Sequence, residues 1–151
     1  MKTAYPISSI LFHKSSSLWT IAPEATVYEA IKLMAEKNIG ALLVISGGKL
    51  TGIFTERDYA RKIALQGKNS RQTHVWEILP KEIVAVTPDD SVEDCMRLMT
   101  ESRVRHLPVM EGENVVGLVS IGDLVNWIIS VQSIAIEQME QYIAGSVSPG
   151  T

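Results

Sequence analysis

The feature that most constrains the fold of this chain is an internal repeat. Residues 20–63 match residues 85–128 without a gap, and about a quarter of the aligned positions are identical. Self-similarity at a fixed period indicates a duplicated structural unit. Because a unit of about 60 residues buries too little surface to be very stable alone, we expect the two copies to form one fold together. The identical pairs include Pro23/Pro88, Val27/Val92, Leu33/Leu98, Met34/Met99, Gly52/Gly117 and Asp58/Asp123.

The sequence pattern of each copy predicts the same order of secondary-structure elements, β-α-β-β-α. A short apolar strand runs into a proline, and a helix then opens with a capping box, Thr26-x-x-Glu29 or Ser91-x-x-Asp94. Two apolar strands follow, separated by a glycine-containing turn, and the last strand runs into a second helix. This order predicts an α/β (α+β) fold with helices packed against small sheets. The expected strands are 21–23, 41–45 and 50–54 in the first copy and 83–88, 107–110 and 115–119 in the second.

The repeat also predicts how the 151 residues are divided. We expect a first repeat over 7–66, a linker over 67–74, a second repeat over 75–130 and a C-terminal helical extension over 131–145. The apolar segments 7–12 and 75–79 precede the two copies, and each is interpreted as the lead-in of the copy that follows it. The last helix outruns its counterpart in the first copy, so its surplus amphipathic turns either form an oligomer contact or pack within the chain.

Charge and cysteine content exclude several classes of protein. The chain has 14 basic and 17 acidic residues and a net charge of −3, which argues against a dedicated nucleic-acid binder. No apolar run is long enough to span a membrane, and the first residues lack the apolar core and cleavage site of a secretion signal. The single cysteine, Cys95, falls on the apolar stripe of a predicted helix and is expected to be a buried, unreactive thiol. We therefore predict a cytoplasmic protein in a reducing compartment.

The junctions between the last strand and the last helix of each copy have the most informative residues. They read Thr55-x-x-Asp58 and Ser120-x-x-Asp123. Helix capping alone can explain both pairs. A carboxylate at a helix start can also accept hydrogen bonds from the two hydroxyls of a ribose. The free N–H groups and positive dipole end of such a helix favour a nearby anion. The chemistry fits a nucleotide, but a motif this short is not specific.

Taken together, these motifs resemble tandem cystathionine-β-synthase (CBS) domains over about residues 7–130. The helix starts Thr26-Val and Ser91-Val, the two Gly-h-h-Thr/Ser-x-x-Asp junctions and the strand at 103–109 (RVRHLPV) all match that pattern. The segment 56–62 (ERDYARK) is similar to small stand-alone CBS-pair proteins. The resemblance implies two repeats packed with pseudo-two-fold symmetry into one module. It also implies clefts that bind adenine nucleotides such as AMP, ATP or NAD(H), and a homodimer.

The resemblance also assigns site residues. Asp58 and Asp123 would bind ribose hydroxyls, with Thr55 and Ser120 beside them. The adenine pockets would be lined by Thr20, Ile21, Ala41, Val86, Thr87 and His106. Arg57, Arg103 and Arg105 would supply cations for phosphate, because a guanidinium donates hydrogen bonds in pairs. These cations are unevenly distributed between the copies, so we expect two clefts that are not equivalent.

The sequence lacks the marks of an enzyme. Its three histidines have no metal-ligand spacing, and no catalytic triad order or glycine-rich phosphate loop is present. We therefore expect no catalytic residues and no metal, but a regulatory module that senses adenine nucleotides and passes occupancy to a dimer or a protein partner. The alternatives are an interaction scaffold without physiological nucleotide binding, a hydrolase or transferase acting on a nucleotide, and, more distantly, DNA binding.

Overall fold

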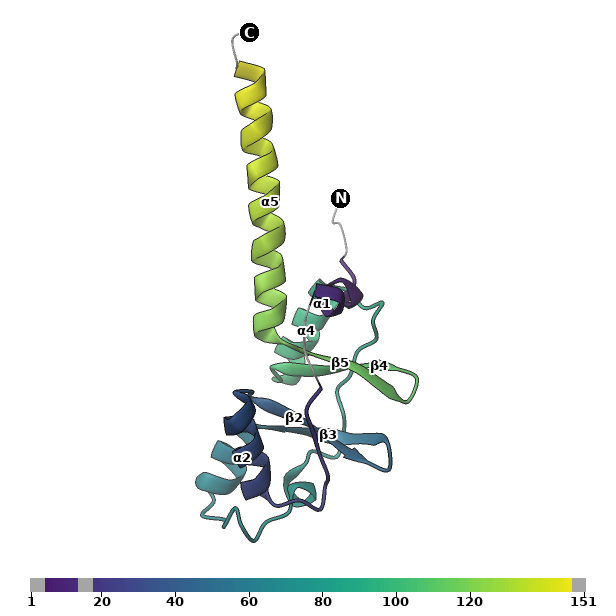
Figure 1. The fold of residues 1–151 in the computed structure, drawn as a ribbon, viewed down its shortest axis with the longest axis vertical. Coiled ribbons are helices and arrows are strands. Elements are labelled where there is room, and N and C mark those ends of the chain that lie inside the picture. Colours follow the sequence, from purple (N-terminus) through teal and green to yellow (C-terminus); the bar gives the residue numbers. More distant parts are fainter. Residues whose placement is uncertain (1–4, 14–17, 148–151) are drawn as a thin grey trace.

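A computed structural model describes residues 5–13 and 18–147 of the chain. It contains two repeats of similar architecture stacked on one another, with a long C-terminal helix projecting from the second (Figure 1). The first repeat consists of β1 (Thr20–Ile21), α2 (Val27–Lys37), β2 (Ala41–Ser46), β3 (Lys49–Thr55), α3 (Glu56–Asp58) and the π-helix η1 (Tyr59–Ala64). The second consists of α4 (Val92–Ser102), β4 (His106–Glu111), β5 (Asn114–Ser120) and α5 (Ile121–Val147). This mixed helix and strand architecture confirms the predicted fold class.

Local sequence explains where the first helix of each repeat begins. Thr26 caps α2 by accepting from the Glu29 backbone N–H at 3.1 Å, and the Glu29 carboxylate accepts from the Thr26 N–H at 3.2 Å, as the predicted capping box requires. In α4, Ser91 accepts from the Asp94 N–H at 3.0 Å. The Asp94 carboxylate accepts from Arg97 at 2.9 Å. The start of α4 therefore keeps the cap by Ser91, but the Asp94 carboxylate pairs with Arg97 one turn along the helix.

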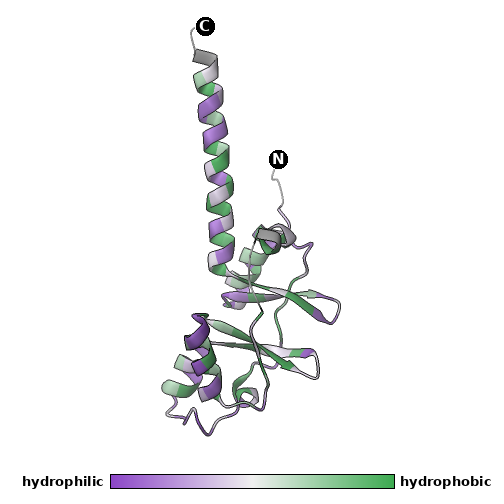
Figure 2. Ribbon diagram, in the orientation of Figure 1, coloured by the Kyte–Doolittle hydropathy of each residue, from purple (hydrophilic) through white to green (hydrophobic). Residues whose placement is uncertain are grey.

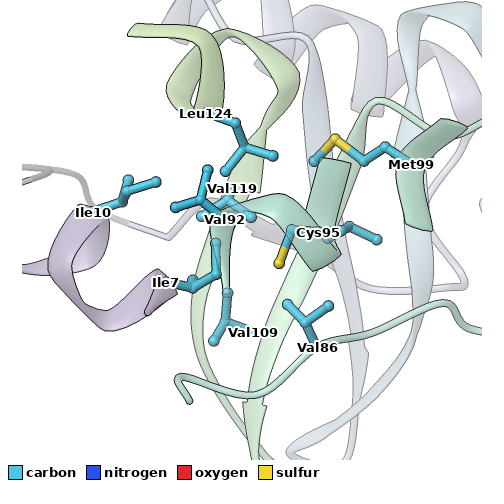
Figure 3. Close-up of a cluster of buried hydrophobic side chains, with 10 residues drawn as sticks. Ile7, Ile10, Val86, Val92, Cys95, Met99, Val109, Val119 and Leu124 are labelled. Carbon is cyan, nitrogen blue, oxygen red and sulfur yellow. The ribbon is translucent and has the colours of Figure 1, made fainter. Parts of the chain in front are cut away.

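The two lead-in segments pack on the opposite repeats. Helix α1 (Ile7–His13) contributes Ile7 and Ile10 to the core of the second repeat, where they meet side chains from α4, β4, β5 and α5 (Figure 3). The 3-10 helix η2 (Val75–Ile78) contributes Val75 and Ile78 to the core of the first repeat. Each segment precedes its repeat in the chain, as predicted, but its apolar side chains complete the core of the other repeat, which the sequence did not predict.

This exchange explains the paired glycines. A Cβ atom built at Gly52 would lie 3.2 Å from Cδ1 of Leu79, which directly follows η2. A Cβ atom at Gly117 would lie 2.5 Å from Cδ2 of Leu11 in α1. A leucine from the exchanged segment thus sits over a glycine in each hairpin, and the missing side chain lets it approach.

The repeats differ in their first strand. In the first repeat, β1 pairs in parallel with β2, and β2 pairs with β3, which makes a three-stranded sheet. The Leu43 N–H donates to the carbonyl of Trp19 there at 3.2 Å. The equivalent position in the second repeat is Pro108, which has no N–H. The expected strand over 83–88 is therefore reduced to one bridge, between Val86 and Val109, beside the two-stranded sheet of β4 and β5.

The last helices differ as well. After Asp58 the first repeat winds as the π-helix η1, with the Leu65 N–H donating to the carbonyl of Ala60 at 3.0 Å. The second repeat continues as one α-helix of 27 residues. The predicted difference in length between these helices is confirmed. The change of winding was not predicted, and it anchors the first helix through Ile63, whereas α5 is anchored through Leu124.

Candidate functional site

The strand-to-helix junction of the first repeat is a closed set of hydrogen bonds around Asp58. Its carboxylate Oδ2 accepts from both the backbone N–H and the hydroxyl of Thr55, each at 3.0 Å. In return, the Asp58 N–H donates to the Thr55 hydroxyl at 3.2 Å. The other oxygen, Oδ1, lies 3.5 Å from Nζ of Lys62. The carboxylate is therefore fixed in orientation, and about a fifth of the side chain stays exposed, so it can accept from a further donor.

A cavity of about 450 Å³ opens beside this junction, between the two repeats. The first repeat supplies the end of β3 and the start of α3, and the second supplies the end of α4, the start of β4 and the segment before its first bridge. A cleft of this size falls in the range that small ligands use. Its lining residues are Gly40, Gly52, Ile53, Thr55, Glu56, Arg57, Asp58, Arg61, Pro80, Glu82, Ile83, Val84, Ser102, Arg103, Val104, Arg105 and His106.

The cleft brings together six of the residues that the sequence assigned to a nucleotide. Thr55, Arg57 and Asp58 come from the first repeat, and Arg103, Arg105 and His106 come from the second. They lie far apart in the sequence and meet only because the repeats stack.

The arginines of the cleft lie close enough to affect one another. The positive charges of Arg61 and then Arg105, with a further contribution from burial, lower the pKa of Arg57 from its usual value, while Asp58 opposes the shift. Arg103 has a left-handed backbone conformation, with φ of 55°, at the end of α4. Asn38 ends α2 in the same conformation, with φ of 54°. Asparagine is a common choice there and arginine is not, so the side chain at 103 is not explained by the helix end.

The remaining seven assigned residues do not line this cavity. Val86 is buried in the core of the second repeat, and Ala41 is buried in β2. Thr87 begins a turn in which its N–H donates to Asp90 at 2.8 Å. Thr20 and Ile21 form β1, on the opposite side of β2 from β3. The last two, Ser120 and Asp123, form the junction of the second repeat.

The segment 80–84 lines the cleft in place of Val86 and Thr87, and the sequence reasoning did not place it there. Pro80, Glu82, Ile83 and Val84 all face the cavity. The sequence feature that could have predicted this lining is Pro108. Because this proline cannot donate to the carbonyl of Val84 as Leu43 does to that of Trp19, the chain is released from the sheet before Ala85.

The junction of the second repeat has the same backbone geometry without the arginines. The Ser120 N–H donates to Asp123 Oδ2 at 2.8 Å, and the Asp123 N–H donates to the Ser120 hydroxyl at 3.1 Å. Between these two residues stand Ile121 and Gly122, where the first junction has Glu56 and Arg57. Both junctions are capping boxes, so the cap itself does not distinguish a ligand site from a structural one.

Other candidate chemistry is limited in the part of the chain that the structure describes. Over residues 5–13 and 18–147, no group of three or more histidine, cysteine, aspartate or glutamate side chains could hold a metal ion. None of the helices in those ranges has the length and apolar character to cross a membrane. Cys95 is fully buried, and burial raises the pKa of its thiol to about 12, so it does not act as a nucleophile near neutral pH.

The structure has two stacked repeats with a cleft between them, the first β-α-β-β-α and the second with its first strand reduced to a bridge. This is the arrangement expected of a tandem CBS pair, and sequence comparison agrees. The CBS domain model matches residues 8–65 and 75–130, so the chain belongs to the CBS-domain family.

Individual relatives extend this assignment. The chain is 40% identical over 149 residues to the CBS domain-containing protein CBSX3, mitochondrial, of Arabidopsis thaliana, covering 92% of this chain and 72% of that one. A solved CBS-domain protein from Burkholderia ambifaria is 49% identical, with a TM-score of 0.80 over 83% of this chain and 95% of that one. A hexameric CBS-CP12 protein from bloom-forming cyanobacteria is 27% identical, with a TM-score of 0.73 over 98% of this chain and 92% of that one.

Proposed function

We propose that this chain is a non-catalytic regulatory module that binds an adenine nucleotide (AMP, ATP or NAD(H)) in the cleft between its repeats. The observation that carries the proposal is the meeting of Asp58 with Arg57, Arg103 and Arg105 in one cavity. A fixed carboxylate suits the two hydroxyls of a ribose, and guanidinium groups suit its phosphates. The apolar side chains of Ile83 and Val84 give an adenine ring a surface to pack on.

Ligand binding across two repeats provides the mechanism of regulation. Asp58 and Arg57 belong to the first repeat, and Arg103, Arg105 and His106 belong to the second. A ligand that contacts both sides favours the relative arrangement in which both sets of contacts form, and it stabilises that arrangement by its differential affinity. A protein partner or second copy that reads this arrangement then responds to nucleotide concentration.

Calorimetry with AMP, ATP and NADH tests the proposal. The variant Asp58→Ala is expected to weaken binding at least tenfold, because a hydrogen bond to a charged group contributes about 1.5–3 kcal/mol. Asp123→Ala is the matched control, since both substitutions remove a capping carboxylate but only Asp58 lines the cleft. Equal affinity in both variants and the unaltered protein would overturn the ribose assignment.

The alternative is an interaction scaffold whose cleft has no physiological nucleotide. Thermal unfolding separates the two, because a ligand that binds only the folded state raises its stability by mass action. An increase in Tm with any of the three nucleotides supports the sensor, and no increase at millimolar concentrations supports the scaffold.

We also propose that the chain self-associates through α5. Every residue from Gln132 to Gly145 is exposed, and Figure 2 shows apolar residues along this projecting helix. An exposed helix of this length is marginal in water unless an apolar face packs against a partner. The hexameric cyanobacterial CBS-CP12 relative, whose structural alignment covers 98% of this chain, supports self-association.

The spacing of the apolar residues on α5 favours a second copy of the same helix. They recur at alternating intervals of four and three residues, which is the heptad pattern of a coiled coil. One glutamine, Gln132, interrupts the stripe near its middle, and a polar residue at such a position fixes which copies pair and in what register. The stripe consists of Val125, Ile129, Gln132, Ile136, Met139 and Ile143.

A pair of substitutions on α5 tests this contact. Ile136 lies on the stripe and Ile134 lies off it, yet their exposed fractions are 56% and 55%. Ile136→Glu is expected to reduce the mass measured by analytical ultracentrifugation, while Ile134→Glu leaves it unchanged. Loss of association in both variants, or in neither, would contradict a stripe-specific contact.

A further inference from the structure

Lys62 joins two parts of the first repeat that are distant in the sequence. It lies in the π-helix η1, and its Nζ donates to the backbone carbonyl of Ile78 at 2.8 Å. The same ammonium lies 3.5 Å from Oδ1 of Asp58. Ile78 is the last residue of η2, and Asp58 lines the cleft. One cation therefore connects the carboxylate of the candidate site with the exchanged segment that packs in the core of the first repeat.

The bond to Ile78 stands at the start of one wall of the cleft. Residues 79–85 belong to no helix or strand. The next backbone hydrogen bond along the described chain runs from the Val86 N–H to the carbonyl of Pro108, at 3.0 Å. The hydrogen bonds at the two ends of this wall are thus those of Lys62 and Pro108. The residues of the wall that line the cleft are Pro80, Glu82, Ile83 and Val84.

Comparison of the repeats shows that this link belongs to the first one. The position aligned with Lys62 is Trp127 in the second copy. The Trp127 ring packs against the core of the second repeat and lies edge-on to Tyr5, with ring centroids 5.9 Å apart. An indole carries no charge, so the ion pair between Lys62 and Asp58 has no counterpart at this position. The lysine accompanies the junction that lines the cleft.

Stabilisation of the helix gives Lys62 only a small role. Lys62 and Asp58 are four residues apart, and their side chains are 34% and 21% exposed. Ion pairs that are open to water contribute little to stability, and 3.5 Å is longer than a charge-assisted hydrogen bond. The shorter contact of the ammonium is with Ile78, in a different segment. The stronger bond of Lys62 therefore acts between segments and not along its own helix.

We infer that Lys62 is a positioning residue that couples ligand binding at Asp58 to the placement of η2 and of the cleft wall over 79–84. The inference rests on the proposed function and names the element that responds to the nucleotide. A nucleotide that donates to Asp58 and packs on Ile83 and Val84 contacts both of the parts that Lys62 connects. It favours the arrangement in which Lys62 holds both, and the response appears at η2, outside the cleft.

Trp76 makes this response measurable. It lies on η2, its side chain is 57% exposed, and its ring stacks on His74 with centroids 6.4 Å apart. Trp76 does not line the cleft. A movement of η2 changes the exposure of this ring to water and its stacking on His74, and both alter tryptophan emission. Subtracting the emission change of the variant Trp76→Phe isolates the part that belongs to Trp76.

Calorimetry and tryptophan emission are measured together with AMP, ATP and NAD⁺, none of which absorbs tryptophan emission. In the unaltered protein, binding is expected to shift the emission of Trp76. Lys62→Met keeps nearly the same side-chain length without the charge. It is expected to lower affinity less than about fivefold, because a partly exposed ion pair contributes at most about that factor, and to remove the shift. Affinity retained in this variant also shows that it is folded.

The matched control is Lys32→Met. Lys32 is an exposed lysine of α2 that does not line the cleft, so its substitution is expected to change neither the affinity nor the emission shift.

The outcomes separate this inference from the proposed function. Binding without a shift of Trp76 emission, or an equal shift in Lys62→Met, would overturn the coupling and leave nucleotide binding intact. A loss of affinity in Lys62→Met as large as that in Asp58→Ala would also overturn the positioning role. Failure of all three nucleotides to bind the unaltered protein would overturn both the coupling and the proposed function.

Discussion

The two strand-to-helix junctions have the same backbone geometry but differ in the charge of the side chains around them. Thr55 and Asp58 at the first, and Ser120 and Asp123 at the second, form the same reciprocal hydrogen bonds at the start of a helix. Around the first junction stand arginines at positions 57, 103 and 105. The aligned positions in the other copy are Gly122, Asn38 and Gly40. The shared hydrogen bonds cap a helix in both repeats, so the arginines are what distinguishes the first junction from the second.

The same comparison extends to the cores, where equivalent residues are buried to different degrees. Ile63 and Ile128 are identical and aligned, but Ile63 is fully buried while Ile128 is half-buried. The π-winding of η1 turns Ile63 inward, whereas in α5 the fully buried anchor is Leu124.

The largest predicted effect tests this difference in winding. Ile63→Ala should lower the free energy of unfolding by about 2–5 kcal/mol, the range for a fully buried large side chain. Ile128→Ala should cost about half as much, and Leu124→Ala should match Ile63→Ala. Urea unfolding measures all three. Equal losses at positions 63 and 128 would show that the two last helices are anchored alike.

The second prediction concerns the glycines beneath the exchanged segments. Gly117→Ala should cost about 1–3 kcal/mol, because its new methyl group would overlap the Leu11 side chain. Gly52→Ala should be nearly neutral, since the contact with Leu79 is longer and a non-glycine residue loses less backbone entropy on folding.

A double-mutant cycle assigns the cost at Gly117 to the exchange. Combining Gly117→Ala with Leu11→Ala should cost less than the sum of the two single substitutions, because the shortened side chain leaves room for the methyl group. Additive losses would mean that α1 does not lie over Gly117 in solution.

The smallest predicted effect is a pH dependence confined to the second repeat. Cys95 is aligned with Ala30, and both are fully buried. Burial, with smaller contributions from Asp90 and Asp94, raises the pKa of Cys95 from 9.0 to about 12. Above pH 9 the unfolded thiol loses its proton while the folded thiol keeps it, so stability is complete below pH 9 and falls as pH rises toward 12.

Urea unfolding at pH 7, 9 and 10 checks this dependence against Cys95→Ala. The difference in unfolding free energy between the two proteins should narrow above pH 9, by at most about 1.4 kcal/mol per pH unit. A constant difference over this range would mean that the thiol is not shielded from water in the folded state.

The sequence predicted the parts of the fold that depend on local chemistry. The caps at Thr26 and Ser91 located α2 and α4, and the glycines at positions 47 and 112 located both hairpins. The alternation of buried residues along β3 and β5 follows the pattern of a half-buried strand. These features were predictable because each depends on residues within a few positions of one another.

The features that were missed depend on contacts between distant segments. Chain order could not show that α1 packs in the core of the second repeat, because the apolar face of a helix does not by itself determine which surface it packs against. The loss of the strand near Val86 follows from a single proline on a different strand, Pro108. The residues around Asp58 and Arg103 were predicted as a set because the resemblance to CBS domains assigned them, whereas the lining by Ile83 and Val84 was not predicted.

The exchanged lead-in segments have a consequence for how this chain can be divided. Each core is completed by a segment that belongs in sequence to the other half, which is the kind of exchange seen between the subunits of a domain-swapped dimer, here within one chain. Cutting between residues 66 and 74 would therefore not release two independent domains. We expect it to yield two fragments that each lack part of a core and therefore fold only in each other's presence.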